Sequence, residues 1–291
     1  MTPKMQYDIC RGLIEEKLAS FFTEDLPQKN LFEAMRYSLL AGGKRIRPVL
    51  TVKFAEAVGG DIESALTAGC AVEMLHTYSL IHDDLPCMDN DELRRGKPTN
   101  HVVFGEYTAT LAGDALQAAA FETVLSIDIE PQRALKAAQV LAFAAGEKGI
   151  CGGQQLDMEG EEKKLSVEEI STIHKMKTAS LIKAACLMGV VVGGGNERQV
   201  KAAEEYAEAI GLAFQIRDDL LDATSTVEEL GKPIGSDKES GKSTYFTHYG
   251  EKNCEELIEE MTDKAVCAVS GAFENPEFLI WLAQELSKRK N

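Results

Sequence analysis

The chain has 291 residues, of which 44% are hydrophobic and 27% are charged, and its formal net charge is −16. This composition is typical of a globular protein with a sizeable buried core. The acidic balance argues against nucleic acid and against an anionic membrane as partners.

The cysteine spacing and the length of the apolar runs bear on the cellular compartment and on membrane insertion. The seven cysteines show no metal-binding spacing, which is typical of a reducing compartment. The longest apolar run, residues 184–192, is too short for a membrane span, and the first residues show no pattern of a signal peptide. We therefore expect a cytoplasmic protein with no membrane span and a single domain over residues 1–291.

Apolar residues recur at helical spacing through most of the chain. The expected helices cover residues 5–22, 31–40, 65–81, 101–121, 131–145, 170–192 and 200–223, and Ser166 with Glu169 forms a capping box before the sixth. No strand pattern, fixed-period repeat or low-complexity segment occurs. The sequence predicts an all-α, single-domain bundle of about ten helices around a central cavity.

A basic segment, GGKRIRP at residues 42–48, follows the second expected helix. The glycines end that helix, and Pro48 can open the next one. Lys44, Arg45 and Arg47 beside a helix N-terminus are suited to binding an anion. A basic helix cap in an acidic protein is the alternative.

The richest stretch lies between His76 and His101, and it contains the motif HDDLPCMD at residues 82–89. Crowded carboxylates repel one another unless a cation lies among them, and magnesium prefers such oxygen ligands. On an unbroken helix Asp83 and Asp89 would point about 120° apart. Pro86 should end the helix near Leu85 and let the chain return Asp89 toward Asp83.

Cations directly follow this motif at Arg94, Arg95 and Lys97. Guanidinium groups bind phosphate through two hydrogen bonds. A metal and phosphate site is therefore predicted, with a solvated acidic helix end as the alternative.

A second acidic motif, FQIRDDLLD at residues 214–222, lies within a long apolar helix. Asp218 and Asp222 are about 40° apart on that helix, and Gln215 lies about 60° from Asp218. Three carboxylates in such a helix are costly unless they bind a metal, although a surface patch is the alternative. The loop after it contains Lys232, Lys238 and Lys242, and Lys177-Thr178 lies in another largely apolar helix.

Two aspartate motifs, each followed by cations, resemble those of the trans-isoprenyl diphosphate synthases, most closely the bacterial farnesyl type. The shared motifs are GGKRIRP at 42–48, HDDLPCMD at 82–89, LRRGKPT at 93–99, GGQQLD at 152–157, MKT at 176–178, FQIRDD at 214–219 and GKPIGSD…GKST at 231–244. The resemblance implies the isoprenoid synthase fold and a homodimer. It also implies a magnesium-dependent transferase that condenses isopentenyl diphosphate head to tail with dimethylallyl or geranyl diphosphate.

The resemblance also implies roles for individual residues. Several Mg²⁺ ions bridging the allylic diphosphate would be held by Asp83, Asp84, Asp89, Asp218, Asp219 and Asp222. The same diphosphate would be bound by Arg94, Lys177, Lys232 and Lys242, and isopentenyl diphosphate by Lys44, Arg47, His76 and Arg95. Thr178 and Gln215 would stabilise a developing carbocation.

Chain length is expected to depend on Tyr78, with the smaller Ser79 beside it. Tyr78 lies about 7.5 Å before Asp83 along a helix, a depth suited to a short isoprenoid. The alternative is that Tyr78 is an ordinary core aromatic and that another residue limits the chain. The expected product is farnesyl diphosphate, with geranylgeranyl diphosphate as the alternative.

Three other classes of protein are alternatives to this one. A terpene cyclase should lack the second aspartate motif and GGKRIRP, and a non-catalytic regulatory subunit should have lost aspartates or cations. A helical protein that only binds divalent cations, without catalysis, would not explain why basic residues follow both acidic motifs.

Overall fold

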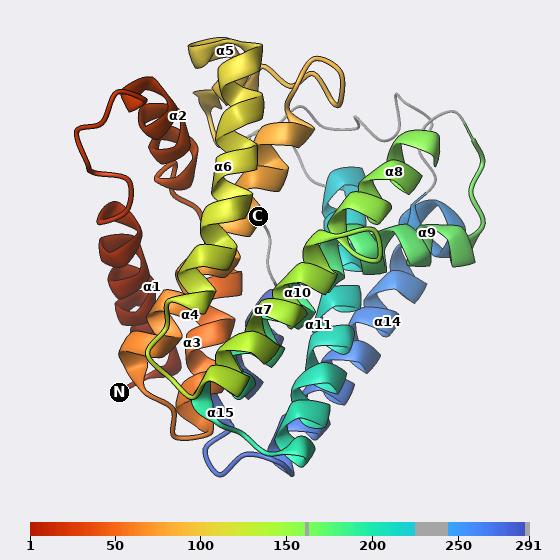
Figure 1. Cartoon of the computed structure of the whole chain (residues 1–291). Helices are drawn as coiled ribbons and strands as arrows, with labels where there is room; N and C mark the ends of the chain where they lie inside the picture. Colours follow the sequence, from red (N-terminus) through yellow and green to blue (C-terminus); the bar gives the residue numbers. More distant parts are fainter. Residues whose placement is uncertain (161–162, 225–243, 289–291) are drawn as a thin grey trace. The chain divides into compact units, whose positions relative to one another are not determined.

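The structure is a computed structural model, and it describes residues 1–160, 163–224 and 244–288. The all-α prediction is confirmed. The strands in the described residues are limited to one hairpin of two strands, each two residues long. The chain divides into two compact units (Figure 1). Unit 1 contains residues 1–142 and 187–195, and unit 2 contains residues 143–186 and 196–291. The single domain remains a prediction.

Unit 1 is built from the N-terminal helices. They are α1 (Pro3–Ala19), α2 (Lys29–Leu39), α3 (Ile46–Ala57), α4 (Ile62–Asp83), α5 (Asn100–Phe104) and α6 (Glu106–Leu125), with the hairpin β1 (Leu93–Arg94) and β2 (Lys97–Pro98) before α5. Helix α7 (Pro131–Ala145) begins in this unit. The expected helix over residues 101–121 is broken at Gly105, whose φ of 84° is costly for any residue with a Cβ.

Helix α4 is the core of unit 1, with α1, α2, α3 and α6 packed around it. Its apolar residues face all directions, which is typical of a helix buried on every side. Gly69 lets α3 approach closely, because a Cβ there would lie 3.2 Å from the carbonyl oxygen of Pro48. Asp61 caps its first turn by accepting a hydrogen bond from the backbone N–H of Ser64 at 2.8 Å.

Unit 2 contains the remaining helices. They are α8 (Ile150–Gly160), α9 (Val167–His174), the π-helix η1 (Lys175–Ala179), the first part of α10 (Ser180–Gly193), α11 (Glu197–Thr224), α14 (Tyr245–Ser270) and α15 (Glu277–Lys288). The predicted capping box of Ser166 and Glu169 is present at the start of α9. The π-helix was not expected from the sequence, and short π-helices occur often at functional sites.

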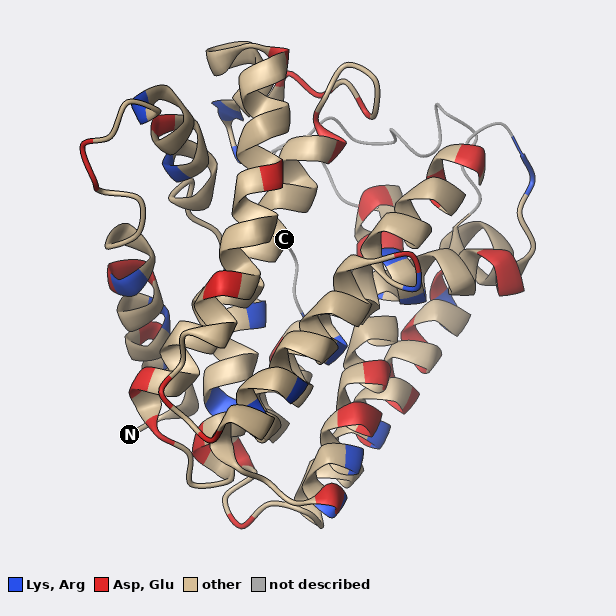
Figure 2. Cartoon of the chain, viewed as in Figure 1, with Lys and Arg blue, Asp and Glu red and all other residues tan. Residues whose placement is uncertain are grey.

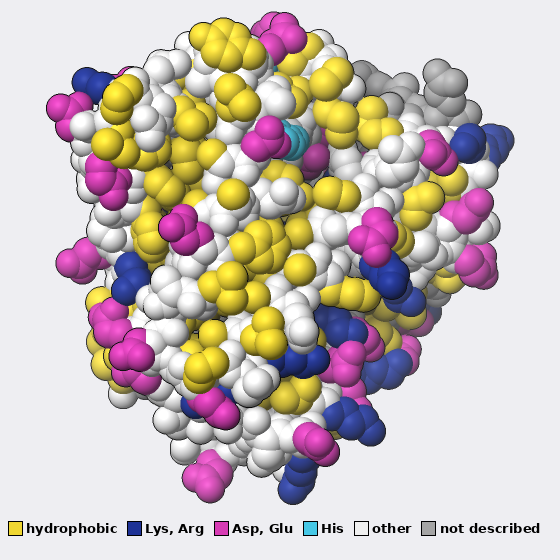
Figure 3. Space-filling model, viewed as in Figure 1, with side chains coloured by type: hydrophobic (Ala, Val, Ile, Leu, Met, Phe, Trp, Pro, Cys, Tyr) yellow, Lys and Arg dark blue, Asp and Glu magenta, His cyan; other side chains and the backbone are white. Residues whose placement is uncertain are grey.

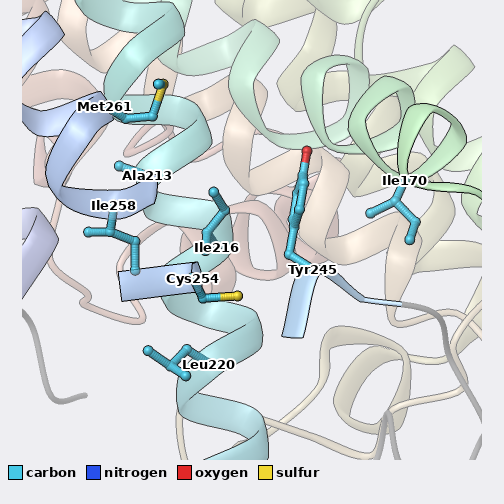
Figure 4. Packing of buried hydrophobic residues seen from close by; sticks show 8 residues of the cluster. All are labelled: Ile170, Ala213, Ile216, Leu220, Tyr245, Cys254, Ile258 and Met261. Atoms are coloured by element: carbon cyan, nitrogen blue, oxygen red, sulfur yellow. The ribbon is translucent and has the colours of Figure 1, made fainter. Parts of the chain in front are cut away.

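A hydrophobic cluster joins α9, α11 and α14 within unit 2 (Figure 4). Its buried members are Ile170, Ala213, Ile216, Leu220, Tyr245, Cys254, Ile258 and Met261. Because Ile216 and Leu220 lie within the second acidic motif on α11, this packing fixes the rotation of the helix and hence the directions of its aspartates.

One helical run, Val167–Gly193, is long and apolar enough to cross a membrane by length and composition. Of its most apolar window, 56% is buried inside the protein, as expected for a core helix of a globular fold.

Candidate functional site

The first aspartate motif lies where α4 ends. Asp83 is the last helical residue and Asp84 is the C-cap. The backbone N–H of Asp89 donates to the carbonyl oxygen of Asp83 at 2.9 Å. The chain therefore turns back after Pro86, as the sequence predicts, and returns Asp89 to the end of the helix. Figure 2 shows acidic positions gathered at this helix end and in the loop after it.

Arg94 holds the carboxylate of Asp84. Its Nε lies 2.7 Å from Oδ1 and 3.0 Å from Oδ2, and its Nη2 lies 2.6 Å from Oδ1. The side chain of Asp84 is only 4% exposed. Burial raises the pKa of this carboxyl above its ordinary value, and the Arg94 guanidinium opposes that rise. The pair is a charge-assisted bidentate bond, so a metal ion at Asp84 would compete with Arg94 for this carboxylate.

The hairpin after the motif orients the two arginines. Arg94 pairs with Lys97 in the strand register, and the turn between them is Arg95-Gly96 with φ of 53° and 73°. Two successive positive φ values are typical of the type I′ turns that join short strands. Arg94 thus faces Asp84, and the Nη1 of Arg95 donates to the carbonyl oxygen of Gly42.

Gly43 explains how Arg95 reaches the basic segment. A Cβ at Gly43 would lie 2.9 Å from the guanidinium carbon of Arg95, so a larger residue would displace that group. Arg95, from the hairpin that follows the first aspartate motif, therefore packs against the glycines of the GGKRIRP segment.

Arg45 has a structural role in unit 1. It is 3% exposed, it adopts a φ of 53°, and its guanidinium binds Glu15, Glu73 and the carbonyl oxygen of Leu39 at 2.5–3.3 Å. Because Arg45 is directed into the core, the exposed Lys44 and the half-buried Arg47 are the residues of this segment left to bind a ligand.

Arg47, His76 and Arg95 form a cationic group. The Nη1 of Arg47 lies 3.3 Å from the Nε2 of His76. Burial lowers the pKa of all three, and the nearby positive charges lower that of His76 further, well below its ordinary value. Among the described residues, none accepts a hydrogen bond from the buried Nε of Arg47. Crowded cations with an unused donor suit a bound anion.

The second aspartate motif lies on α11, and its middle carboxylate is already engaged. Asp219 is 6% exposed, its Oδ2 accepts the backbone N–H of Tyr245 at 2.8 Å, and its Oδ1 accepts the Nε2 of Gln215 at 3.3 Å. Asp219 thus holds the first residue of α14. Asp218 and Asp222 lie on the same half-buried face of α11.

Arg217 lies between these aspartates in the sequence but binds elsewhere. Its Nη1 and Nη2 each lie 2.7 Å from an oxygen of Glu255 on α14. The guanidinium of Arg217 is therefore directed toward α14.

Lys177 lies in the π-helix and forms an ion pair at 2.7 Å with Asp157 of α8. In the structure, the anion that the Lys177 ammonium faces is this carboxylate. A Cβ at Gly153 would lie 2.2 Å from the backbone nitrogen of Lys177, so the glycine permits the contact between α8 and η1. Thr178 follows Lys177 in the same π-helix.

Sequence reasoning did not select Asp157 or its neighbour Gln154 as site residues. Gln154 is 7% exposed, and neither of its amide atoms has a hydrogen-bond partner among the described residues. The motif GGQQLD was the available signal, but the ion pair to Lys177 depends on a contact between separate helices.

Tyr78, which is expected to limit chain length, and the smaller Ser79 beside it are both buried in α4. Tyr78 is 4% exposed, and its ring meets that of His82 edge-on, with centroids 5.6 Å apart. His82 in turn packs on α6, because its Nε2 lies 3.0 Å from the carbonyl oxygen of Thr110. The hydroxyl of Ser79 donates to the carbonyl oxygen of His76 at 2.9 Å.

The donor chemistry of these motifs fits a magnesium site. In the described part of the chain, no three His, Cys, Asp or Glu side chains gather closely enough to hold a metal ion. Arg94 binding to Asp84 and Tyr245 binding to Asp219 account for two of the six carboxylates. All six offer hard oxygen ligands of the kind that magnesium prefers. Lys232 and Lys242 lie outside the described residues.

Comparison with known proteins identifies the family. Residues 28–270 match the model of the polyprenyl synthetase family, so the chain belongs to this family. It is 51% identical over 239 residues to geranylgeranyl pyrophosphate synthase 3 of Arabidopsis thaliana, a match that covers 80% of this chain and 66% of the relative. The match thus spans slightly less than two thirds of that relative's length.

Bacterial proteins are also similar to this chain. Farnesyl diphosphate synthase of Geobacillus stearothermophilus is 48% identical over 235 residues, which cover 80% of this chain and 79% of the relative. The structure of an FPP/GFPP synthase from Zymomonas mobilis superposes with a TM-score of 0.87 at 35% identity and covers 98% of both chains. The predicted family and fold class are therefore confirmed.

Proposed function

We propose that this protein is a magnesium-dependent prenyltransferase that condenses isopentenyl diphosphate head to tail with dimethylallyl and geranyl diphosphates. The observation that carries the proposal lies within unit 1. Helix α4 and the segments packed on it present two different anion-handling groups, the carboxylates at Asp83–Asp89 and the cations around His76. His76 and Asp83 are about 10.5 Å apart along the helix axis, which leaves room for two substrate diphosphates.

Each group has a distinct task in this proposal. Asp83, Asp84 and Asp89, together with Asp218, Asp219 and Asp222, would hold magnesium, which neutralises the allylic diphosphate as its C–O bond breaks. Arg94 and Lys177 bind the same diphosphate. Lys44 and the cationic group of Arg47, His76 and Arg95 bind isopentenyl diphosphate without a metal, and fix its double bond relative to the allylic carbon.

The remaining chemistry is the formation of one carbon–carbon bond. The departing diphosphate takes the electron pair of the C–O bond, and the double bond of isopentenyl diphosphate attacks the resulting allylic cation. Loss of one proton restores a double bond, and the departed diphosphate is the candidate acceptor. Thr178 and Gln215 supply oxygen dipoles toward the cation, which must be protected from water.

Incubation with magnesium, radiolabelled isopentenyl diphosphate and either allylic acceptor tests the reaction. Labelled prenyl diphosphates should form with magnesium and should be absent in excess chelator. Cyclic hydrocarbon products would identify a terpene cyclase. No product with either acceptor, from folded protein that still binds magnesium, would contradict catalysis and leave a divalent-binding protein.

The product we propose is farnesyl diphosphate, because the buried ring of Tyr78 lies one turn before the aspartate motif and packs on His82. Geranylgeranyl diphosphate is the second candidate, since the Arabidopsis relative is a geranylgeranyl pyrophosphate synthase. Chromatography of the dephosphorylated products distinguishes fifteen carbons from twenty.

We also propose a homodimer in the cytoplasm. Large apolar side chains are exposed on α6, including Tyr107 at 75%, Leu111 at 53% and Leu125 at 56%, and Figure 3 shows apolar side chains gathered over the region of this helix. Apolar patches of this kind are typical of interfaces. Sedimentation of the wild type and of Leu111→Lys should give a dimer and a monomer. A wild-type monomer at micromolar concentration would contradict the dimer.

A further inference from the structure

A pocket of about 800 Å³ lies within unit 2, between the π-helix and helices α11 and α14. Its volume falls in the range of roughly 300–1,000 Å³ that small-molecule sites occupy. The lining includes Met176 and Ala179 of the π-helix, Leu212 of α11, and Met261 of α14. Lys177, Thr178 and Gln215 do not line it, so this pocket is distinct from the residues assigned to catalysis.

The rim of the pocket is cationic although the chain is strongly acidic. Four lysines and two glutamates line it, whereas the whole chain has a net charge of −16. Lys183 is neutralised by Glu204 and Glu208 at 2.5 and 2.9 Å. The other three lysines, at positions 148, 175 and 264, line the pocket together with one further glutamate, Glu205.

These three lysines are only weakly compensated. Lys175 is exposed and forms no ion pair with any described residue. Lys148 lies 4.0 Å from Glu147, with both side chains largely exposed, and Lys264 pairs with Glu260 at 2.7 Å on the surface of α14. Exposed pairs of this kind are weak because water screens the two charges, so the lysines can bind an anionic ligand.

The pocket shares a wall with the catalytic candidates. Met176 and Ala179 face the pocket, while Lys177 of the same π-helix binds Asp157 of α8. Met176 also contacts α8, because a Cβ at Gly152 would lie 2.6 Å from its terminal methyl carbon. A molecule that displaces Met176 therefore acts on both partners of the Lys177–Asp157 pair.

We propose that this pocket is a regulatory site for a single-chain anionic amphiphile. The apolar chain would lie against Met176, Leu212 and Met261, and the phosphate or carboxylate head would bind the lysines at 148, 175 and 264. Occupancy shifts the π-helix and thereby changes turnover. The effect on turnover rests on the proposed prenyltransferase function, whereas binding does not.

Calorimetric titration with dodecyl phosphate in the presence of chelator tests the binding. Cys267 is exposed at the rim, so Cys267→Trp blocks the pocket without disturbing the core, and circular dichroism checks its fold. Binding should weaken at least tenfold in this variant. Ala268→Phe, which fills the same rim, should reproduce the loss.

Glu259→Trp provides the matched control, because Glu259 is exposed on the same helix and lies outside the pocket. It should bind within twofold of the wild type. Lys264→Glu should weaken dodecyl phosphate about threefold or more, and dodecyltrimethylammonium should not bind. Equal affinity in the wild type and Cys267→Trp, or equal binding of the cationic amphiphile, would overturn the proposal.

Two ligand sources share this chemistry, a prenyl diphosphate and a fatty acid. Farnesyl diphosphate and palmitate are compared in the same titration, and the tighter ligand whose binding depends on Cys267 identifies the source. In the prenyl transfer assay, dodecyl phosphate should lower kcat at unchanged KM for isopentenyl diphosphate in the wild type and in Glu259→Trp, but not in Cys267→Trp. Absence of any prenyl transfer would contradict the proposed function and leave the calorimetric test intact.

Discussion

Arg94 and Asp84 are joined by three nitrogen–oxygen contacts of 2.6–3.0 Å at the end of α4. The guanidinium of Arg94, from the hairpin after the acidic motif, therefore binds one of the carboxylates with which the proposed function would hold magnesium. A ligand that binds Arg94 through phosphate would free Asp84 for the metal at the same time. Metal binding and allylic substrate binding are thus expected to reinforce each other.

Arg94→Gln should tighten magnesium binding in the absence of substrate, because the metal no longer competes with the guanidinium for Asp84. Turnover should nevertheless fall, with a raised KM for the allylic diphosphate. Calorimetry with magnesium and initial-rate kinetics measure the two effects. Arg95→Gln is the control, since Arg95 contacts Gly42 rather than Asp84, and it should leave metal affinity unchanged.

Asp218→Asn and Asp219→Asn should differ in stability. Asp218→Asn should lower turnover by orders of magnitude with little change in the free energy of unfolding. Asp219→Asn replaces a charged acceptor of the buried Tyr245 N–H, and weakening such a bond typically costs about 1–3 kcal/mol. Urea denaturation and steady-state rates separate the two outcomes. Equal stability of the two variants would show that Asp219 is not needed to hold α14.

Lys44→Ala and Arg47→Ala should chiefly raise the KM for isopentenyl diphosphate, and Arg94→Ala that for the allylic diphosphate. The reason is the separation of the two groups along α4, with Arg47 beside His76 and Arg94 beside Asp84. Initial rates with each substrate varied in turn give both constants. Equal changes in both constants for all three variants would disprove the division into two diphosphate sites.

Tyr78→Ala should shift the products toward twenty carbons or more, because it removes a buried ring next to the predicted metal site. Ser79→Ala is the matched control on the same helix and should leave the product distribution unchanged. Truncating a large buried aromatic costs about 3–5 kcal/mol, so Tyr78→Leu is included to retain more of the packing. An unchanged distribution in both Tyr78 variants would remove this residue as the determinant of length.

His76 makes stability depend on pH. Burial and the nearby arginines lower its pKa in the folded chain, well below the ordinary 6.5, whereas the unfolded chain has the ordinary value. The unfolded state therefore binds more protons as the pH falls below 6.5, and stability contributed by neutral His76 is present above 6.5 and lost at lower pH. Denaturation at pH 7.5 and 5.5 should show a smaller loss for His76→Asn than for the wild type. An equal loss would mean that His76 is not linked to unfolding.

Local sequence signals predicted much of this structure because they depend on neighbouring residues. Pro86 predicted the end of α4, and the bounds of α7 agree with the expected 131–145. The capping box at Ser166 and the shared face of Asp218 and Asp222 are likewise local features. The family resemblance supplied the grouping of residues that are distant in the sequence.

Contacts between separate elements could not be predicted in the same way. The π-helix at Lys175–Ala179 depends on the fit of α8 against it at Gly153, and helical periodicity carries no signal for that fit. The use of Asp219 to hold Tyr245 arises because α14 begins beside α11. From the sequence alone, Arg94 could point toward Asp84 or toward solvent. Its direction is set by the pairing of β1 with β2.

The continuity of α4 has a consequence for how such a protein diverges. His76, Tyr78 and Asp83 lie on one uninterrupted helix, so one inserted or deleted residue between them would rotate one group relative to the other by about 100° and move it by about 1.5 Å. Substitution at Tyr78 changes the local space and preserves that register. Evolution of product size is therefore expected to proceed by replacement of side chains along this helix, while insertions and deletions between His76 and Asp83 are eliminated by selection.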